Sequence, residues 1–237
     1  MPLIALALCI VMNTLPGMAQ EKPNDHSAIG YGVKLGMTSS GFYQKNLTRK
    51  PHTADIAGLT VGAYADYGVL SFIDISAELL YLQQGGSRTE IINSWADNSP
   101  VVTTAYTRLH NLEANLLVKL SLPRATKPLK PHLLLGPGVG YNITAVQQQD
   151  ITYDYGGYRL TGSGSEDVRA DFISLQYGLY AGLGADIDMG SQQLSIDLRY
   201  RYGLSPINNG YNPFNELANV NDFSSNSWMV TIGYQIK

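Results

Sequence analysis

The sequence predicts an all-β fold, an eight-stranded antiparallel β-barrel that crosses the outer membrane. Three observations predict it. Segments of about ten residues alternate apolar and polar side chains with a period of two, they are longer than ordinary strands, and the connections between them are alternately long and short. A strand of about 9–11 residues is long enough to cross a bilayer at a tilt.

The alternating segments follow one another through the chain. In order they are 30–38, 58–67, 73–81, 112–121, 132–143, 173–187, 194–203 and 228–236. The fourth segment illustrates the pattern, since Leu112 and Leu116 share one face while Glu113 lies on the other. Each of the other segments likewise carries Leu, Ile, Val, Ala or Tyr on one face and mainly glycine, hydroxyl or charged residues on the other.

The connections are sorted by length. The long ones are 39–56, 84–105, 144–171 and 205–226, and the short ones are 68–71, 122–131 and 189–193. A barrel with both termini in the periplasm has this rhythm, because its loops lie at the extracellular end and its turns at the other. We therefore expect four extended extracellular loops and three tighter turns.

Alternation alone leaves open which face is inside, because a soluble lipocalin-like barrel has the same period. The membrane is favoured because aromatic residues recur at the ends of the apolar face, where rings seat at lipid headgroups. These residues are Tyr31, Tyr67, Tyr81, Tyr141, Tyr200, Tyr202, Trp228 and Tyr234. The soluble carrier remains the alternative fold, and partitioning into water without detergent would favour it.

Composition agrees with a membrane barrel of OmpA/OmpX-like size. The chain has 237 residues, only 15% of them charged, with 24 Gly, 16 Tyr and a net charge of −3. The lack of a basic surplus argues against a nucleic-acid partner. The mean hydropathy of −0.08 is an average over two opposed faces, and after the N-terminal segment no apolar run is long enough for a membrane helix.

The N-terminus predicts export. An apolar stretch over residues 3–12 is followed by Gly17-Met18-Ala19, a small-x-small cleavage motif. We expect residues 1–19 to be a signal peptide and residues 20–237 to form the mature barrel domain. Because Cys9 is the only cysteine, the mature chain would contain none.

Short motifs along the mature chain resemble the PorT-like outer-membrane barrel family of Bacteroidetes. The matching pieces are Gly32-Val33-Lys34-Leu35-Gly36, Glu78-Leu79-Leu80-Tyr81 followed by Gly85, Leu112-Glu113-Ala114-Asn115-Leu116-Leu117-Val118-Lys119, Gly136-Pro137-Gly138 and Arg199-Tyr200-Arg201-Tyr202-Gly203-Leu204. The resemblance implies an eight-stranded outer-membrane barrel. Named members are associated with protein secretion, but the resemblance implies no reaction and no functional residue.

The polar face carries charged residues at similar depths. We predict that they form a paired structural network inside the barrel, because an eight-stranded interior is only wide enough for side chains to fill it. The residues of this network are Lys34, Glu78, Glu113, Lys119, Arg199 and Arg201. Lys119 and Arg201 lie nearer the strand ends, as do Asp74, Asp186 and Asp197. Glu78 and Glu113 would repel each other, so we expect Arg199 or Lys34 to lie against both.

The sequence indicates no catalytic, cofactor or metal residue. His110 and His132 lack a Ser at suggestive spacing, and no Cys or His pair has zinc spacing. We expect a monomeric, non-enzymatic outer-membrane protein that presents its loops in a structural or interaction role. The alternatives are an accessory of protein secretion or envelope assembly, a small pore, and a lipid-modifying enzyme.

Two kinds of partner are expected. The apolar face would contact outer-membrane lipids, and a basic group in the first long loop, Lys45, Arg49, Lys50 and His52, suits lipopolysaccharide phosphates. Envelope or secretion proteins are the other candidates.

Overall fold

The computed structural model describes residues 29–44, 52–94, 99–122, 129–155, 158–207 and 223–236. The predicted signal peptide at residues 1–19 lies outside these ranges, as do Lys45, Arg49 and Lys50 of the first long loop.

Strands account for almost all of the described secondary structure. They are β1 (Ile29–Gln44), β2 (His52–Leu70), β3 (Ile73–Asn93), β4 (Pro100–Ser121), β5 (Leu129–Tyr155), β6 (Tyr158–Asp167), β7 (Leu175–Asp188), β8 (Gln192–Gly203) and β9 (Phe223–Ile236). Helical structure in these ranges is a single 3-10 turn, η1 (Arg169–Asp171). None of it is long and apolar enough to cross a membrane as a helix.

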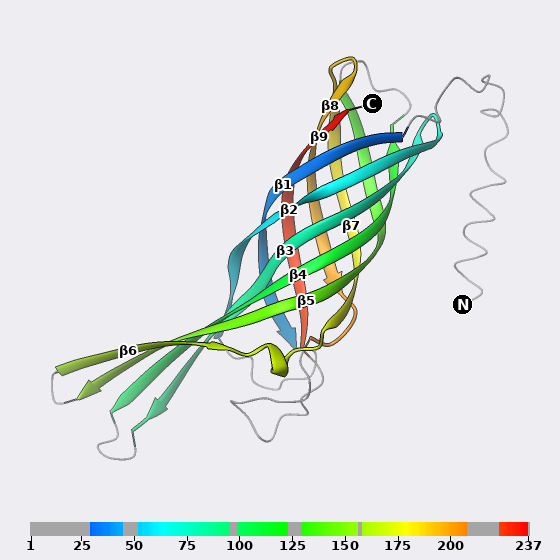
Figure 1. Ribbon diagram of the computed structural model, residues 1–237. Coiled ribbons are helices and arrows are strands. Elements are labelled where there is room, and N and C mark those ends of the chain that lie inside the picture. The colour runs from blue at the N-terminus through cyan, green and yellow to red at the C-terminus, as the bar shows by residue number, and fades with distance from the viewer. Residues whose placement is uncertain are drawn as a thin grey trace.

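The strands form one sheet that closes into a ring (Figure 1). Neighbours follow the order β4-β3-β2-β1-β9-β8-β7-β5, and a pairing of β4 with β5 completes the ring. Each of these pairings is antiparallel. The ring therefore has eight strands, which confirms the predicted fold class. Closure satisfies the backbone hydrogen bonds of every strand without an open edge in the lipid.

The barrel wall has two unlike faces. Along β4, Leu112, Leu116 and Leu120 are exposed on the outside, whereas Glu113 and Lys119 are buried in the lumen. A water-soluble protein would bury a continuous apolar surface of this kind. We therefore call this outer surface of the ring the lipid-facing band. The alternation predicted from the sequence is confirmed here.

The two ends of the barrel differ. Short connections lie at the end where β1 begins and β9 ends. Tyr31 pairs with Ile236 at this end, and residues 71–72 join β2 to β3 there. At the other end β3, β4, β5 and β6 run together past the barrel and away from its axis (Figure 1). We call this four-stranded projection, residues 87–106 of β3 and β4 with 147–167 of β5 and β6, the extension.

The extension corrects two sequence predictions. Segments 84–105 and 144–171 were expected to be loops, but β3 continues to Asn93, β4 begins at Pro100, β5 reaches Tyr155 and β6 is an additional strand. The extension has little core, and all of β6 is exposed. Backbone hydrogen bonds between neighbouring strands hold it together, so these strands need no strict alternation of apolar and polar residues.

A one-residue bulge divides the two parts of β5. His110 pairs with Thr144 and Asn111 with Asn142, which leaves Ile143 as an extra residue. Even-numbered residues such as His132 and Asn142 point into the lumen before the bulge, and odd-numbered residues such as Ala145 do so after it. The bulge therefore changes which residues of β5 face outward in the extension.

Candidate functional site

The strand register brings all six predicted network residues into the lumen. Lys34, Glu78, Glu113, Lys119, Arg199 and Arg201 are each at most 4% exposed. Each occupies an inward position of its strand, between outward neighbours that face lipid. Asp74 lies nearer the rim, is half-buried and has no ion-pair partner among the described residues.

An ion pair crosses the centre of the lumen. Arg199 on β8 and Glu78 on β3 come from opposite walls of the ring, since three strands separate them in either direction. Arg199 Nη1 lies 2.7 Å from Glu78 Oε2 and Nη2 lies 3.0 Å from Oε1, which is a bidentate contact. Lys34 Nζ donates to the same carboxylate at 2.6 Å.

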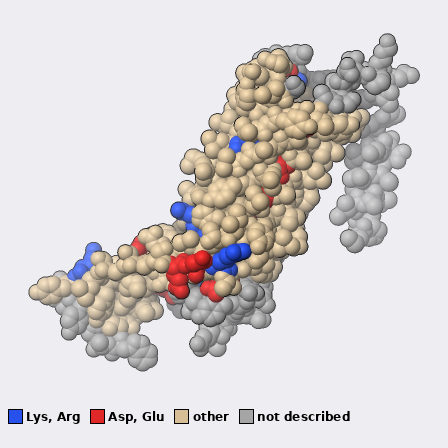
Figure 2. Space-filling model, in the orientation of Figure 1, with Lys and Arg blue, Asp and Glu red and all other residues tan. Residues whose placement is uncertain are grey.

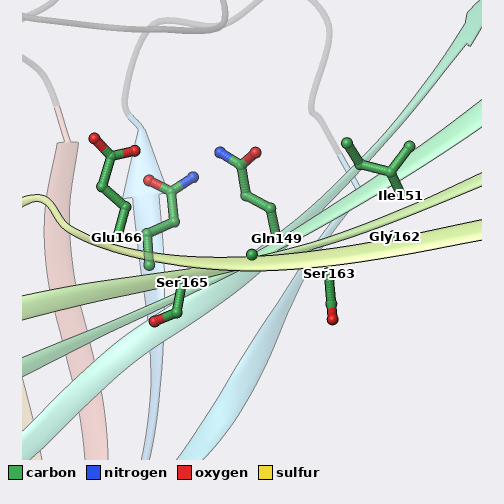
Figure 3. Close-up of a pocket in the computed structure, with 8 residues that line it drawn as sticks. Gln149, Ile151, Gly162, Ser163, Ser165 and Glu166 are labelled. Atoms are coloured by element: carbon green, nitrogen blue, oxygen red, sulfur yellow. The ribbon is translucent and has the colours of Figure 1, made fainter.

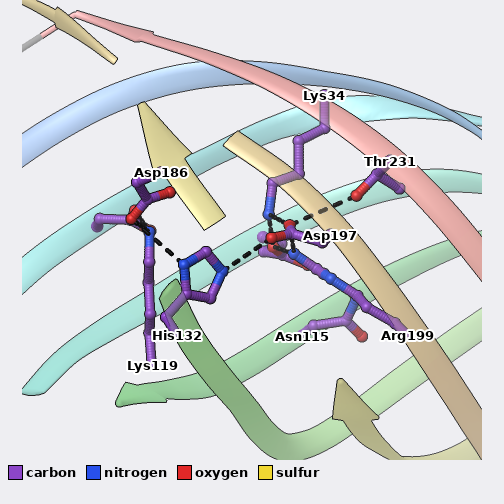
Figure 4. Close-up of polar contacts among 10 residues, drawn as sticks. Lys34, Asn115, Lys119, His132, Asp186, Asp197, Arg199 and Thr231 are labelled. Atoms are coloured by element: carbon purple, nitrogen blue, oxygen red, sulfur yellow. Dashed lines mark hydrogen bonds and ion pairs between the residues drawn. The ribbon is translucent and has the colours of Figure 1, made fainter. Parts of the chain in front are cut away.

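Asp197 joins this central pair from the side of Arg199. Its Oδ2 accepts from Arg199 Nη2 at 2.6 Å and from Lys34 Nζ at 3.1 Å. Figure 4 shows Lys34, Asp197 and Arg199 converging in the lumen, with Thr231 of β9 beside them. Arg199, Lys34, Glu78 and Asp197 therefore form one group, in which each carboxylate contacts both cations.

A second layer lies toward the end of the barrel where β1 begins and β9 ends. Lys119 Nζ lies 2.6 Å from Asp186 Oδ2 and 3.5 Å from Asp66 Oδ2. His132 connects this layer to the centre, because its Nδ1 is 3.4 Å from Asp186 and its Nε2 is 2.9 Å from Asp197. Figure 4 shows the imidazole lying between the two carboxylates.

Glu113 belongs to a separate group. Arg201 Nη2 lies 2.9 Å from Glu113 Oε1, and the Tyr180 hydroxyl also donates to this carboxylate. Arg201 is on β8 and Glu113 is on β4, and two strands, β7 and β5, lie between them. The Arg201 side chain must therefore extend over β7 and β5 to reach Glu113. Gly178 and Gly140 make this possible: a Cβ on Gly178 would meet the Arg201 guanidinium at 3.2 Å, and one on Gly140 would meet Glu113 Oε1 at 2.8 Å.

The buried charges nearly balance. The acids are Asp66, Glu78, Glu113, Asp186 and Asp197, which is five, and the bases are Lys34, Lys119, Arg199 and Arg201, which is four. One positive charge on His132 would bring the two totals to five each. Its position between two carboxylates favours that charge, because unpaired charges are costly where water is scarce.

Apolar side chains close the lumen toward the end from which the extension projects. Leu82, Leu117, Leu134, Tyr180 and Met229 form one cluster at the level of the charged groups. A second cluster, Leu109, Ala145, Val168 and Ile207, packs with Phe42, Phe172 and Phe223 where β5 separates from β7. Charged layers and apolar clusters together fill the interior, as expected for a ring of this size.

The sequence prediction was incomplete in two respects. Arg199 and Lys34 contact Glu78 but not Glu113, which has Arg201 and Tyr180 instead. Asp66, His132 and Tyr180 were not included in the predicted network. All three occupy inward positions of alternating strands. The alternation of inward and outward positions along each strand was therefore the signal that could have identified them.

His132 and His110 have acidic or phenolic partners. Among the described residues, no group of three or more His, Cys, Asp or Glu side chains could hold a metal ion. His132 contacts two aspartates, and His110 Nδ1 lies 2.5 Å from the Tyr81 hydroxyl.

Two hollows lie on opposite faces of the extension. On the lumen side, a hollow of about 380 Å³ has Gly162 and Gly164 on its floor, beside Gln149 and Ile151. Figure 3 shows Gln149, Ile151 and Glu166 rising from one side of the β5–β6 pair, with Ser163 and Ser165 on the other. A hollow of about 480 Å³ lies on the outer side, and it is lined by Arg108 and His110 among others.

Comparison with known proteins finds solved structures that are similar to this chain at low sequence identity. Similar solved structures include Neisserial surface protein A, with 12% identity over 87% of this chain and 96% of that chain (TM-score 0.43). OprG from Pseudomonas aeruginosa has 13% identity over 89% of this chain and 96% of that chain (TM-score 0.43). Ail, the attachment invasion locus protein of Yersinia pestis, has 13% identity over 87% and 98% (TM-score 0.36).

Sequence comparison gives two results. No curated protein sequence matches the chain significantly. A family model described as an outer membrane protein beta-barrel domain matches residues 18–209, which is most of the chain. Since that match covers the ring from β1 to β8, the chain belongs to the outer membrane protein beta-barrel domain family.

Proposed function

We propose that this protein is a sealed, non-catalytic outer-membrane barrel that presents its extracellular extension to a partner. The observation that carries the proposal is the Arg199–Glu78 pair, which crosses the lumen between opposite walls. A side-chain bridge at the barrel centre, with an apolar cluster above it, suits an anchor better than a pore.

The extension suits the presenting role. Both faces of β6 are exposed, and Tyr158, Leu160 and Ile91 are exposed by 76%, 58% and 66%. In the described ranges β6 pairs with β5 alone, so its second edge offers unpaired backbone groups. Exposed strand edges and aromatic side chains are common features of protein-recognition surfaces.

Several predicted properties belong to this proposal. Residues 1–19 would direct export and then be removed. The lipid-facing band would contact outer-membrane lipids including lipopolysaccharide, and the barrel would work as a monomer. The PorT-like resemblance favours an envelope or secretion protein as the partner of the extension. A role as an accessory of secretion is thus one possible outcome of the partner experiment below.

The sealed barrel predicts electrical silence. Purified protein inserted into planar lipid bilayers should give no stepwise conductance, because ion pairs and apolar clusters fill the lumen along its length. A porin inserted into the same bilayers provides the positive control. Reproducible conductance steps from the pure protein would contradict a sealed barrel and support the small-pore alternative.

The presenting role predicts that partners depend on the extension. Replacing residues 88–105 and 149–165 by tight Gly-Asn turns should leave a barrel that folds in the membrane, because the lipid-facing band is untouched. Proximity labelling in intact cells should then lose the proteins that the full-length chain labels.

A second variant keeps the strands but removes their apolar exposure. Ile91, Ile92, Tyr158 and Leu160 are replaced by Thr, which retains strand propensity. Loss of the same partners in both variants supports presentation by the extension. Unchanged labelling in both would contradict it, and would direct the search for partners to the barrel wall or the periplasmic end.

A further inference from the structure

The outer hollow lies where the extension leaves the barrel. It measures about 480 Å³ and is lined by Ile56, Tyr106, Arg108, His110, Val146, Gln148, Asp150 and Ser165. Figure 2 shows that charged side chains are sparse over the visible barrel wall and gather near the start of the extension.

The strand register places this hollow at the outer membrane boundary. Leu112 pairs with Tyr81 on one side and with Tyr141 on the other, so these two rings mark the extracellular end of the lipid-facing band. His110 and Arg108 are the next outward-facing residues along β4. They therefore lie just above the band, at the level of lipid headgroups.

A chain of hydrogen bonds fixes the orientation of His110. The Leu59 backbone N–H donates to Gln83 Oε1 at 3.1 Å, which turns Gln83 Nε2 toward the Tyr81 hydroxyl, also at 3.1 Å. Because Tyr81 accepts that bond, its own proton is available for His110 Nδ1 at 2.5 Å. The neutral imidazole then carries its proton on Nε2, as a donor for the hollow.

Arg108 supplies the second donor. Its cross-strand neighbours are Gly85 and Val146, neither of which has a polar side chain. Among the described residues it has no hydrogen-bond or ion-pair partner. Burial and the adjacent Arg108 charge both lower the pKa of His110, which lies outside the lipid-facing band. An anion bound beside both groups would offset the Arg108 charge and so raise the pKa of His110 again.

The far end of the hollow has different chemistry. Gln148, Asp150 and Ser165 lie on the extension side, away from the membrane, and offer acceptors and donors suited to hydroxyl or amino groups. Tyr106 adds an aromatic ring that is 42% exposed. The complementary ligand is therefore negative near the membrane and rich in hydroxyl groups above it.

We propose that this hollow binds the phosphorylated sugar headgroup of an outer-leaflet glycolipid. Arg108 and His110 bind the phosphate, while Tyr106 and the polar residues of β5 contact the sugar. The proposal rests on the outer-membrane placement of the barrel, but requires neither a sealed lumen nor a protein partner. Its failure would therefore leave those two ideas untouched.

The test uses the full-length mature protein folded in detergent micelles. Diphosphorylated lipid A and the same lipid without phosphates are titrated, and bound copies are counted by native mass spectrometry. Arg108→Gln combined with His110→Gln should weaken binding of the phosphorylated lipid by about tenfold or more, as expected for loss of charge-assisted bonds. Arg159→Gln, an exposed arginine at the far end of the extension, is the matched control and should bind normally.

Each outcome decides the proposal. Preference of the native protein for the phosphorylated lipid, lost in the double variant alone, supports it, and weaker binding by Tyr106→Ala adds support for the sugar contact. Equal binding of both lipids by the native protein overturns it without reliance on any variant. Displacement of the lipid by millimolar inorganic phosphate alone, or equal losses in the Arg159→Gln control, would also overturn it.

Discussion

Replacing Arg199 by alanine is expected to lower the free energy of unfolding by about 3–5 kcal/mol, the cost of removing one partner from a buried ion pair. Arg199 is fully buried and makes three short contacts to Glu78 and Asp197. Without it, Glu78 keeps only Lys34 among its ion-pair partners in the described residues, and Asp197 keeps Lys34 and His132. Arg199→Lys should recover part of the loss, since an ammonium group restores the charge but not the bidentate geometry.

Urea titration in detergent micelles, followed by circular dichroism and by the mobility of folded barrels in unheated gels, measures this effect. Arg159→Ala is the control, because its ion pair with Asp154 is fully in water at the surface of the extension. It should leave the unfolding midpoint unchanged. An Arg199→Ala protein as stable as the native one would show that the cross-lumen pair does not support the barrel.

The Glu113–Arg201 pair should show strong coupling in a double-mutant cycle. Glu113→Gln and Arg201→Met are each expected to destabilise the barrel by about 3–5 kcal/mol, because each strands a buried charge. The double variant removes both charges, so neither position holds an unpaired charge. The double variant should therefore lose less than the sum of the single losses, with a coupling energy of about 1–3 kcal/mol.

The same urea titrations measure all four corners of this cycle. Tyr180→Phe serves as a reference, since it removes a hydrogen-bond donor to Glu113 while keeping both charges, and it should have a smaller effect. Additive losses for Glu113→Gln and Arg201→Met would mean that the two side chains act independently, despite their 2.9 Å contact.

The two faces of the barrel could be predicted because lipid and lumen impose opposite demands on neighbouring residues. In β9, Trp228, Val230 and Ile232 face outward while Thr231 and Gln235 are buried inside. The sequence of a membrane strand therefore separates the residues of its two faces, and the aromatic residues at the ends of the apolar face indicate that this face is the outer one. The connections could be sorted by length for a related reason, since the short ones are too short to hold anything except turns.

The extension could not be predicted in the same way, because water reaches much of both its faces. Residues such as Gln148, Gln149 and Thr152 have no strict alternation, although each belongs to the β5 ladder. The bulge at Ile143 also reverses the inward parity of β5, so a pattern extended from Leu133 gives the wrong face beyond it. Pairing with β4 and β6, which is tertiary information, determines the structure of this segment.

The charged network was partly predictable for a comparable reason. The alternation along each strand identifies which residues face the lumen. Which of these residues pair with each other depends on the stagger of the strands and on the space left by small residues on the strands between them. Arg201 reaches Glu113 because Gly178 and Gly140 leave a path over two strands, whereas Arg199 crosses to the opposite wall. Neither route follows from one strand considered alone.

The continuity of β4 and β5 has a mechanical consequence. Both strands run from the rim opposite the extension to the extension itself, and their hydrogen bonds lie perpendicular to the strand direction. A pull on the tip therefore loads these bonds in shear, many at once, instead of opening them one after another. Tension applied to the tip of the extension would thus reach the barrel wall directly, without a hinge to absorb it.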